Sequence, residues 1–376
     1  MKNKINWKSV IVVAGAYVSY GIGSGFATGQ EVLQNFAAWG TPACFVALIL
    51  CAVAYSYFCG SLYRAGLMND FKNESDAYVY FFGKYLGRAI DIFSVVLVFL
   101  FIIAMFSGCA STIHLYYGVD PLVGQIIMAV VCGGTVALGL RKMQDILSCM
   151  GVVFIIYILI MGIMALCKAN QSLTASSVNM SQYIEAGKVL PAVSFGFKSA
   201  ITAGISYGLV ALVVAFPFLV SLGKRVTNKS EANVSGIATG VAYTAACLIV
   251  TCIILFNLDY IMNNGGEQVP LLSAIHNMAP SISWTFAIIL MLGIYTTITG
   301  YIWFVSSRFA ADRTPKSCII AGVVTFVGMI GGYFIPFNTI TNILYPFTGW
   351  IGGVMVIFLI YKDIKNRKSV STKTAE

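Results

Sequence analysis

Three glycines alternate with other residues in the middle of the first long apolar run, and an acid follows them. They are Gly21, Gly23 and Gly25, and the acid is Glu31. Glycine destabilises a helix by about 1 kcal/mol per residue relative to alanine, so three of them this close together predict an unwound joint. Small residues also line close contacts between helices in membranes, and tight packing is therefore the alternative.

A similar tripeptide occurs in the sixth apolar run. Ser206-Tyr207-Gly208 matches Ser19-Tyr20-Gly21, and the two occupy corresponding places if the chain consists of two halves of five runs each. We therefore predict a second interruption at this tripeptide. Paired interruptions in corresponding membrane segments mark the central binding site of many transporters.

Interrupted helices could bind a small charged solute through their backbone. A half-helix start presents free N–H groups, which favour a carboxylate, and a half-helix end presents free C=O groups, which favour Na⁺ or an ammonium group. A zwitterionic amino acid would satisfy both. The candidate substrate-binding residues flank the two interruptions or lie in the middle of the third run: Gly21, Ile22, Gly23, Ser24, Gly25, Phe106, Ser107, Ser206, Tyr207 and Gly208.

Glu31 is the acid that we place well inside an apolar run. It lies six residues after Gly25, which is about 9 Å along a straight helix, and this places it on the outer side of the central site. Because ionisable groups are costly at membrane depth, we predict a gating or proton-sensing role, with structural pairing as the alternative. Asp91 and Asp145 are expected to pair with the neighbouring Arg88 and Lys142 at span ends.

The elements that carry these residues are membrane helices. The 376 residues are 59% hydrophobic and 10% charged, with a mean hydropathy of +0.85, whereas soluble domains carry about 25% charged residues. Unbroken apolar runs of about 20 residues fit helices rather than barrel strands. We predict an all-α protein with ten spans at residues 8–37, 41–63, 89–113, 121–140, 144–167, 199–222, 233–258, 283–307, 317–335 and 339–361.

The basic residues predict how these spans are oriented. Of the 23 Lys and Arg, all but Lys168, Lys188 and Lys198 fall in segments that ten spans would place on one side of the membrane. By the positive-inside rule both termini are cytoplasmic, and we expect a multi-pass protein of a bacterial inner membrane. The net charge of +9 then reflects topology and contact with lipid, and it does not require a nucleic-acid partner.

The same span count predicts two inverted repeats. They cover residues 1–167 and 199–361, with an external loop at 168–198 that contains a short surface helix and a cytoplasmic tail at 362–376. A helix at Val269–Met278 is expected over the outer mouth, either as a lid or as a structural cap. Two histidines and ten cysteines without a Cys-x-x-Cys motif predict no metal site, disulfide framework or resident cofactor.

The run Gly-Ile-Gly-Ser-Gly-Phe-Ala-Thr-Gly-Gln-Glu, residues 21–31, resembles the YkvI-like uncharacterised bacterial membrane proteins. These are distant members of the amino acid–polyamine–organocation superfamily. The resemblance extends over nearly the whole chain in the number and spacing of spans, and the first run is its specific part. It implies the LeuT-type fold of five plus five helices with broken helices 1 and 6. It also implies alternating access, with spans 1, 2, 6 and 7 rocking against the rest.

The resemblance further implies a sodium site between the first and eighth spans. Sodium-coupled members of the superfamily carry a small residue shortly before two hydroxyl residues in span eight, and Gly293-Ile294-Tyr295-Thr296-Thr297 fits this pattern. Thr296 and Thr297 would then bind Na⁺ together with the backbone carbonyls of Tyr17 and Tyr20. The alternative is that these threonines only form hydrogen bonds to neighbouring helices. The fifth span lacks the lysine that proton-coupled members use.

These observations predict a secondary active transporter of a small solute, an amino acid or similar zwitterion, driven by Na⁺. The alternatives are a solute-binding receptor subunit of the same fold, similar to germinant receptors, and a proton-coupled transporter. We do not expect an enzyme, because neither a His-Glu-x-x-His nor a Gly-x-Ser-x-Gly motif occurs. The sequence specifies neither the substrate nor the oligomeric state.

Overall fold

The structure is a computed structural model that describes residues 5–22, 24–72, 74–169, 172–189, 199–266, 269–335 and 337–373. Helices make up the regular secondary structure of this part of the chain. The first half contains α1 (Trp7–Gly21), α2 (Ser24–Thr28), α3 (Gln30–Asn35), η1 (Ala37–Trp39), α4 (Ala43–Met68), α5 (Glu74–Phe82), α6 (Lys84–Tyr117), α7 (Pro121–Ala137) and α8 (Leu140–Cys167).

The remaining elements start with a helix inside the predicted external loop, as expected. They are α9 (Leu173–Glu185), α10 (Ala200–Val214), α11 (Phe216–Leu222), η2 (Gly223–Arg225), α12 (Lys229–Phe256), α13 (Leu258–Asn263), α14 (Pro270–Met278), η3 (Pro280–Ile282), α15 (Ser283–Ser306), α16 (Pro315–Phe334) and α17 (Phe337–Lys373). α17 continues without interruption into residues that we had predicted as a tail.

Several helices are long and apolar enough to cross a membrane. Within the described residues five helices meet this criterion by length and composition, namely α4, α6, α12, α15 and α16. The bent pair α10 and α11 makes a sixth if it counts as one span, and α7 and the second part of α8 are shorter apolar helices. The all-helical membrane architecture therefore agrees with the prediction, whereas the number ten stays a prediction.

The first predicted interruption is present. α1 ends at Gly21, Ile22 is its C-cap with a non-helical ψ of 75°, and α2 starts at Ser24. A second bend follows at Gly29, whose φ of 86° lies in the left-handed region that glycine adopts without strain. The first predicted span is thus divided into three helices.

The second interruption lies at a different position from the predicted one. α10 is continuous through Ser206, Tyr207 and Gly208, and the chain breaks at Ala215, where α10 and α11 meet at 74°. The cause is Pro217, which occupies the first turn of α11 and cannot continue a preceding helix. Gly208 serves packing instead, because an added Cβ would lie 2.9 Å from the Cβ of Ala54 on α4.

The helices form two packed groups with the remaining helices around them. In the first group, α10, α11 and α12 pack on α4, and α1 packs on α12, whereas in the second group α6, α7, α15 and α16 pack together. Glycines allow close approach within the first group: a Cβ on Gly66 would lie 1.9 Å from the carbonyl oxygen of Val220. α8 lies against both groups, and α17 lies against α10 and α6.

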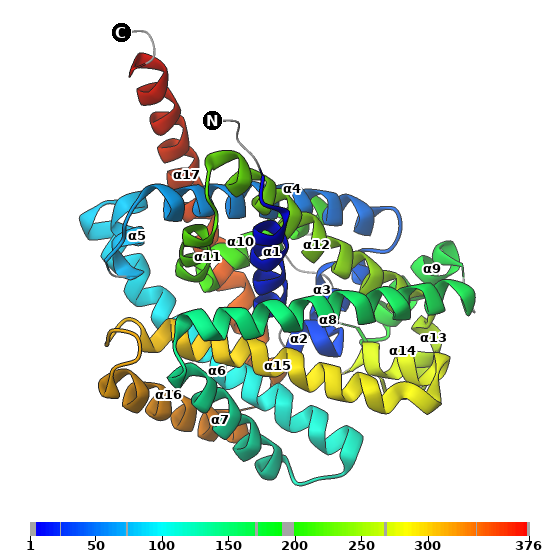
Figure 1. The fold of residues 1–376 in the computed structure, drawn as a ribbon. Helices are drawn as coiled ribbons and strands as arrows, with labels where there is room; N and C mark the ends of the chain where they lie inside the picture. The colour runs from blue at the N-terminus through cyan, green and yellow to red at the C-terminus, as the bar shows by residue number, and fades with distance from the viewer. Residues whose placement is uncertain are drawn as a thin grey trace.

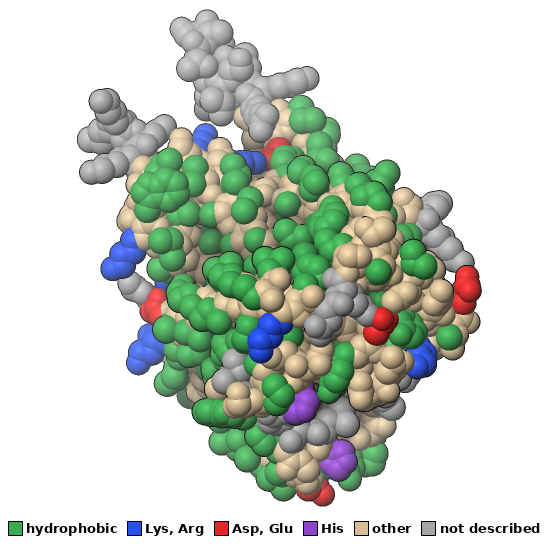
Figure 2. Space-filling model, turned by 90° about the vertical axis from the view of Figure 1, so that its right-hand side faces the viewer, with side chains coloured by type: hydrophobic (Ala, Val, Ile, Leu, Met, Phe, Trp, Pro, Cys, Tyr) green, Lys and Arg blue, Asp and Glu red, His purple; other side chains and the backbone are tan. Residues whose placement is uncertain are grey.

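The connecting segments gather at two opposite ends of the molecule. Figure 1 shows α9, α13 and α14 at the right-hand end, and α5 together with the connection from α15 to α16 at the left-hand end. The segments predicted to lie outside the membrane therefore share one end. Figure 2 looks at this end, where charged side chains are scattered among hydrophobic and other polar ones.

Candidate functional site

A small cavity lies where the two helix breaks meet. Its volume is about 30 Å³, which is room for about one water molecule. α1, α3, α4, α10, α12 and the break residue Ala215 contribute most of its wall, and α6 and α15 of the second group contribute the rest. Its lining residues are Tyr17, Tyr20, Gly21, Glu31, Tyr55, Phe101, Met105, Tyr207, Val210, Val214, Ala215, Tyr243 and Tyr301.

Tyrosine hydroxyls satisfy the carbonyl groups that the breaks expose. Tyr243 of α12 donates to the carbonyl oxygen of Gly21 at the end of α1, at 3.2 Å. Tyr20 of α1 donates to the carbonyl oxygen of Val214 at the end of α10, at 2.6 Å. These carbonyls belong to the orphan acceptors of a helix end, and each keeps a second lone pair.

Two aromatic layers enclose the cavity. Toward the α14 end, the hydroxyls of Tyr207 and Tyr243 lie 2.9 Å apart, and Phe36 packs edge-on against Tyr207 with ring centroids 5.0 Å apart. Toward the α5 end, Tyr20 stacks on Phe218 of α11 at 4.4 Å. Aromatic side chains therefore lie on both sides of the cavity, toward each end of the molecule.

Glu31 lies at the cavity itself and not some 9 Å beyond it. The chain turns at Gly29, so the straight-helix distance does not apply, and the half-buried carboxylate folds back toward α2. A Cβ on Gly25 would lie 2.7 Å from the carboxylate oxygen Oε2 of Glu31, so glycine at this position makes room for the acid. None of the lining residues is Lys, Arg or His.

The residues proposed for sodium lie together between α1 and α15. Thr296 Oγ1 donates to the carbonyl oxygen of Ser19 at 2.8 Å, and Thr297 Oγ1 donates to that of Tyr20 at 2.9 Å. Both threonines are at most 1% exposed. Ser19, rather than the predicted Tyr17, supplies the second backbone contact, whereas Tyr17 contributes its side chain to the cavity.

This arrangement suits a hard cation as well as the direct hydrogen bonds that we considered as the alternative. Thr296 Oγ1 also lies 2.9 Å from the carbonyl oxygen of Gly293, so five neutral oxygens are gathered near the C-terminal end of α1. Neutral oxygen ligands suit hard cations, and the negative end of a helix dipole favours positive charge. No cluster of three His, Cys, Asp or Glu that could hold a metal occurs in the described ranges.

Phe106 and Ser107 do not line the cavity. The carbonyl oxygen of Phe106 accepts a hydrogen bond from Gln125 of α7, and both residues pack against Gly332 of α16. Successive helical residues are rotated by about 100°, so Phe101 and Met105 turn toward the cavity from the same helix while Phe106 points away.

Some of the other predicted site residues line the cavity, and others do not. Gly21 and Tyr207 line the cavity, whereas Ile22 is fully buried and, like Ser206 and Gly208, does not line it. Gly23 lies outside the described residues, and Ser24 is described only as the first residue of α2. Tyr55, Tyr243 and Tyr301 were not predicted, because nothing in the sequence distinguishes them from the other aromatic residues.

The acids near span ends pair across helices instead of with their sequence neighbours. Asp91 lies 2.8 Å from Arg308, two residues after the end of α15, and Asp145 lies 2.7 Å from Arg225 in η2. The predicted pairs with Arg88 and Lys142 were wrong, because tertiary packing brings longer-range arginines closer to these carboxylates.

Comparison with known proteins places the chain near uncharacterised membrane proteins. No protein-family profile matches the sequence. The chain is 20% identical to the uncharacterized membrane protein YkvI of Bacillus subtilis, over 95% of this chain and 97% of the relative. It is 22% identical to the uncharacterized protein YyaD of the same organism, over 92% and 94% of the two chains.

Solved structures of transporters share the fold. An outward-open, substrate-bound Na⁺-coupled sialic acid symporter matches with a TM-score of 0.54, 11% identity and coverage of 95% of this chain and 85% of the other. Mhp1, a nucleobase-cation-symport-1 family transporter, matches with a TM-score of 0.54, 18% identity and coverage of 94% and 77%. A manganese transporter of Eremococcus coleocola matches with a TM-score of 0.56, 13% identity and coverage of 96% and 80%. The chain thus resembles LeuT-fold transporters in architecture.

Proposed function

We propose that this chain is a secondary active transporter of a small solute that carries a protonated amine, an amino acid or a simple amine, and that it is coupled to Na⁺. The observation that carries the proposal is the cavity at two helix breaks, with walls from both groups of helices. Rocking of the first group against the second would open the cavity alternately to each side, and the fold shared with known symporters supports this mechanism.

The preference for an amine follows from the charges around the cavity. Glu31 supplies a carboxylate, and the C-terminal ends of α1 and α10 both direct the negative end of a helix dipole toward the cavity. Tyrosine rings add aromatic faces, which attract cations. The substrate has less need of a carboxylate, which would bind to free N–H groups at the starts of α2 and α11. Both helices are short, and Pro217 removes one N–H group from the start of α11.

Sodium would bind between Thr296, Thr297 and the end of α1. An ion at this position would replace direct hydrogen bonds between α15 and α1, so its binding would favour one relative position of the two groups. Proton coupling through Glu31 is the second candidate, because this acid lines the cavity. We place the protein in a bacterial inner membrane with both termini in the cytoplasm.

Thermal unfolding of the purified protein tests this function. A ligand that binds only the folded protein raises its apparent stability. Each amino acid should be compared with the matching amine that lacks the carboxylate and the matching acid that lacks the amine, in NaCl and in KCl of equal ionic strength. We avoid choline as the replacement cation because it could itself enter an amine site. A stabilising ligand would then be tested for flux in proteoliposomes.

Glu31→Gln provides the matched variant, and Glu185→Gln, at an exposed residue of α9, is its control. We expect amines and amino acids to stabilise the wild type and the control, and Glu31→Gln to weaken this binding about tenfold or more, since a hydrogen bond to a charged group contributes about 1.5–3 kcal/mol. Stabilisation by the acids alone would contradict the amine preference. A ligand that binds without any flux would support the receptor alternative.

A further inference from the structure

A second and larger cavity lies at the α5 end of the molecule. Its volume is about 280 Å³, and it opens between the last turns of α4, the first turns of α12, α5 and the late part of α17. None of its lining residues belongs to the central cavity. It is therefore a separate site.

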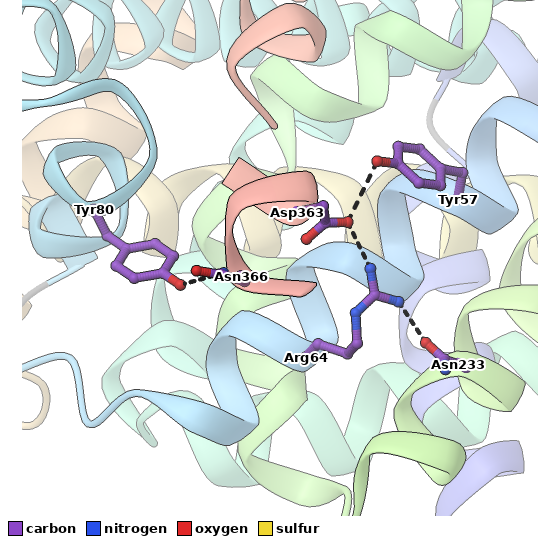
Figure 3. Close-up of polar contacts among 6 residues, drawn as sticks. All are labelled: Tyr57, Arg64, Tyr80, Asn233, Asp363 and Asn366. Carbon is purple, nitrogen blue, oxygen red and sulfur yellow. Dashed lines mark hydrogen bonds and ion pairs between the residues drawn. The ribbon is translucent and has the colours of Figure 1, made fainter. Parts of the chain in front are cut away.

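A polar network holds its wall in place (Figure 3). Arg64 of α4 forms an ion pair with Asp363 of α17 at 2.6 Å and also donates to the amide oxygen of Asn233 on α12. Across the cavity, Asn366 of α17 donates to the hydroxyl of Tyr80 on α5 at 2.9 Å. Donor-bearing side chains from four helices, α4, α5, α12 and α17, thus face one space.

The charges around this cavity do not balance. Asp363 is the acid in its lining and is already paired with Arg64, which leaves the positive charge of Lys229 without a compensating carboxylate in the wall. Lys229 is exposed and forms no ion pair with the described residues. It is also the first residue of α12, where the positive end of the helix dipole adds to its charge. The site therefore favours an anion.

The position of the cavity indicates which anion. Arg64 lies in the last turns of a candidate membrane span and Lys229 begins another, so the cavity lies where a span meets the headgroup region. Apolar surface continues from it, since Met68 in its wall is 48% exposed. An anion that carries acyl chains would use both the polar wall and the apolar surface.

We propose that this cavity binds the phosphodiester headgroup of an anionic phospholipid. Arg64 and Lys229 would contact the phosphate, and the amides of Asn233 and Asn366 are placed to contact the headgroup. Basic pockets between membrane helices recognise anionic headgroups in this way, and each nearby basic residue contributes about 1 kcal/mol. Because the cavity joins α4 and α12 of the first group to α17, a bound lipid would stabilise this contact.

The test is lipid binding to delipidated protein in a neutral detergent, measured by native mass spectrometry and by thermal unfolding. The probes are phosphatidylglycerol, phosphatidylcholine and inorganic phosphate. We expect phosphatidylglycerol to bind and to raise the unfolding temperature, and the other two to have no such effect. Lys229→Gln should weaken phosphatidylglycerol binding about fivefold.

Lys84→Gln is the matched control, because Lys84 is also an exposed lysine that begins a long helix at this end but lines neither cavity. Unchanged binding by Lys229→Gln, or equal loss in Lys84→Gln, would overturn the proposal. Equal binding of phosphatidylcholine would also overturn it. Stabilisation by inorganic phosphate alone would indicate a site for free anions instead of lipid.

Discussion

At the residue scale, some hydrogen bonds near the breaks stay within one group of helices, and others connect the two groups. Tyr20 and Tyr243 join α1, α10 and α12, which all belong to the first group of helices. Their hydroxyls would move together with the carbonyl groups that they satisfy. Thr296 and Thr297 instead join α15 of the second group to α1 of the first. These contacts must break, or be bridged by an ion, whenever the two groups separate.

Thr297→Val tests the proposed role of sodium. Valine keeps the shape of the side chain but removes the hydroxyl, so we expect sodium-dependent stabilisation to weaken about tenfold in apparent affinity. Thermal unfolding over a NaCl series at constant ionic strength, with KCl as the replacement, measures this effect. The control is Thr299→Val, because Thr299 is equally buried but donates to Tyr295 of its own helix. Equal sodium responses in both variants would refute the site.

At the element scale, the two broken spans reach similar geometry by different means. The first half-helix of each, α1 and α10, has 15 residues. α1 ends among glycines, which destabilise the helix, whereas α10 ends before Pro217, which cannot continue it. Sequence similarity between Ser19-Tyr20-Gly21 and Ser206-Tyr207-Gly208 therefore did not locate the second break, since the glycines of α10 allow close packing on α4.

Glycine on α15 is similarly required by packing. A Cβ on Gly300 would lie 2.4 Å from the ring of Tyr20, which is stacked on Phe218 and cannot move freely. We expect Gly300→Ala to destabilise the protein by about 1–3 kcal/mol through overpacking, visible as a lower unfolding temperature. Gly322→Ala on the exposed face of α16 is the control, because nothing lies within 4 Å of its added Cβ. A drop of the same size in both variants would show that the contact with Tyr20 is not the cause.

At the scale of the whole molecule, the two groups and the two ends define how the protein would work in a membrane. The cavity lies between the groups, with aromatic layers toward each end. α14 covers the aromatic layer at its own end of the molecule, since a Cβ on Gly29 at the bend would lie 2.8 Å from the Cβ of Leu271 on α14. This contact fits both a lid and a structural cap. Under the proposed mechanism, opening toward the α14 end would separate α14 from α2 and α3, which it contacts.

Cysteine labelling tests the predicted orientation. In a variant whose exposed Cys149, Cys167 and Cys318 are changed to serine, a single cysteine is introduced at Lys72 or Glu185. We expect a membrane-impermeant maleimide, added to intact cells, to label Glu185→Cys and to leave Lys72→Cys unlabelled until the membrane is opened. The reverse pattern would invert the orientation, and labelling of both from outside would require a different number of spans.

The sequence by itself determined that the protein lies in a membrane and that the helix of its first span is broken. Low charge and long apolar runs require membrane helices because backbone groups must be satisfied without water, and three glycines among five residues weaken a helix wherever it packs. The helices inside 168–198 and near 269–278 also followed from local pattern.

Only the tertiary structure decided which side chains surround the cavity. The bend at Gly29 moves Glu31 to the centre, and the rotation of α6 selects Phe101 and Met105 over Phe106. The hydroxyl of Tyr243 donates to the carbonyl oxygen of Gly21, although the two residues are 222 positions apart in the sequence. Such contacts depend on how the helices rotate and cross. An apolar helix has similar residues on all of its faces, so its sequence does not show which face points toward the cavity.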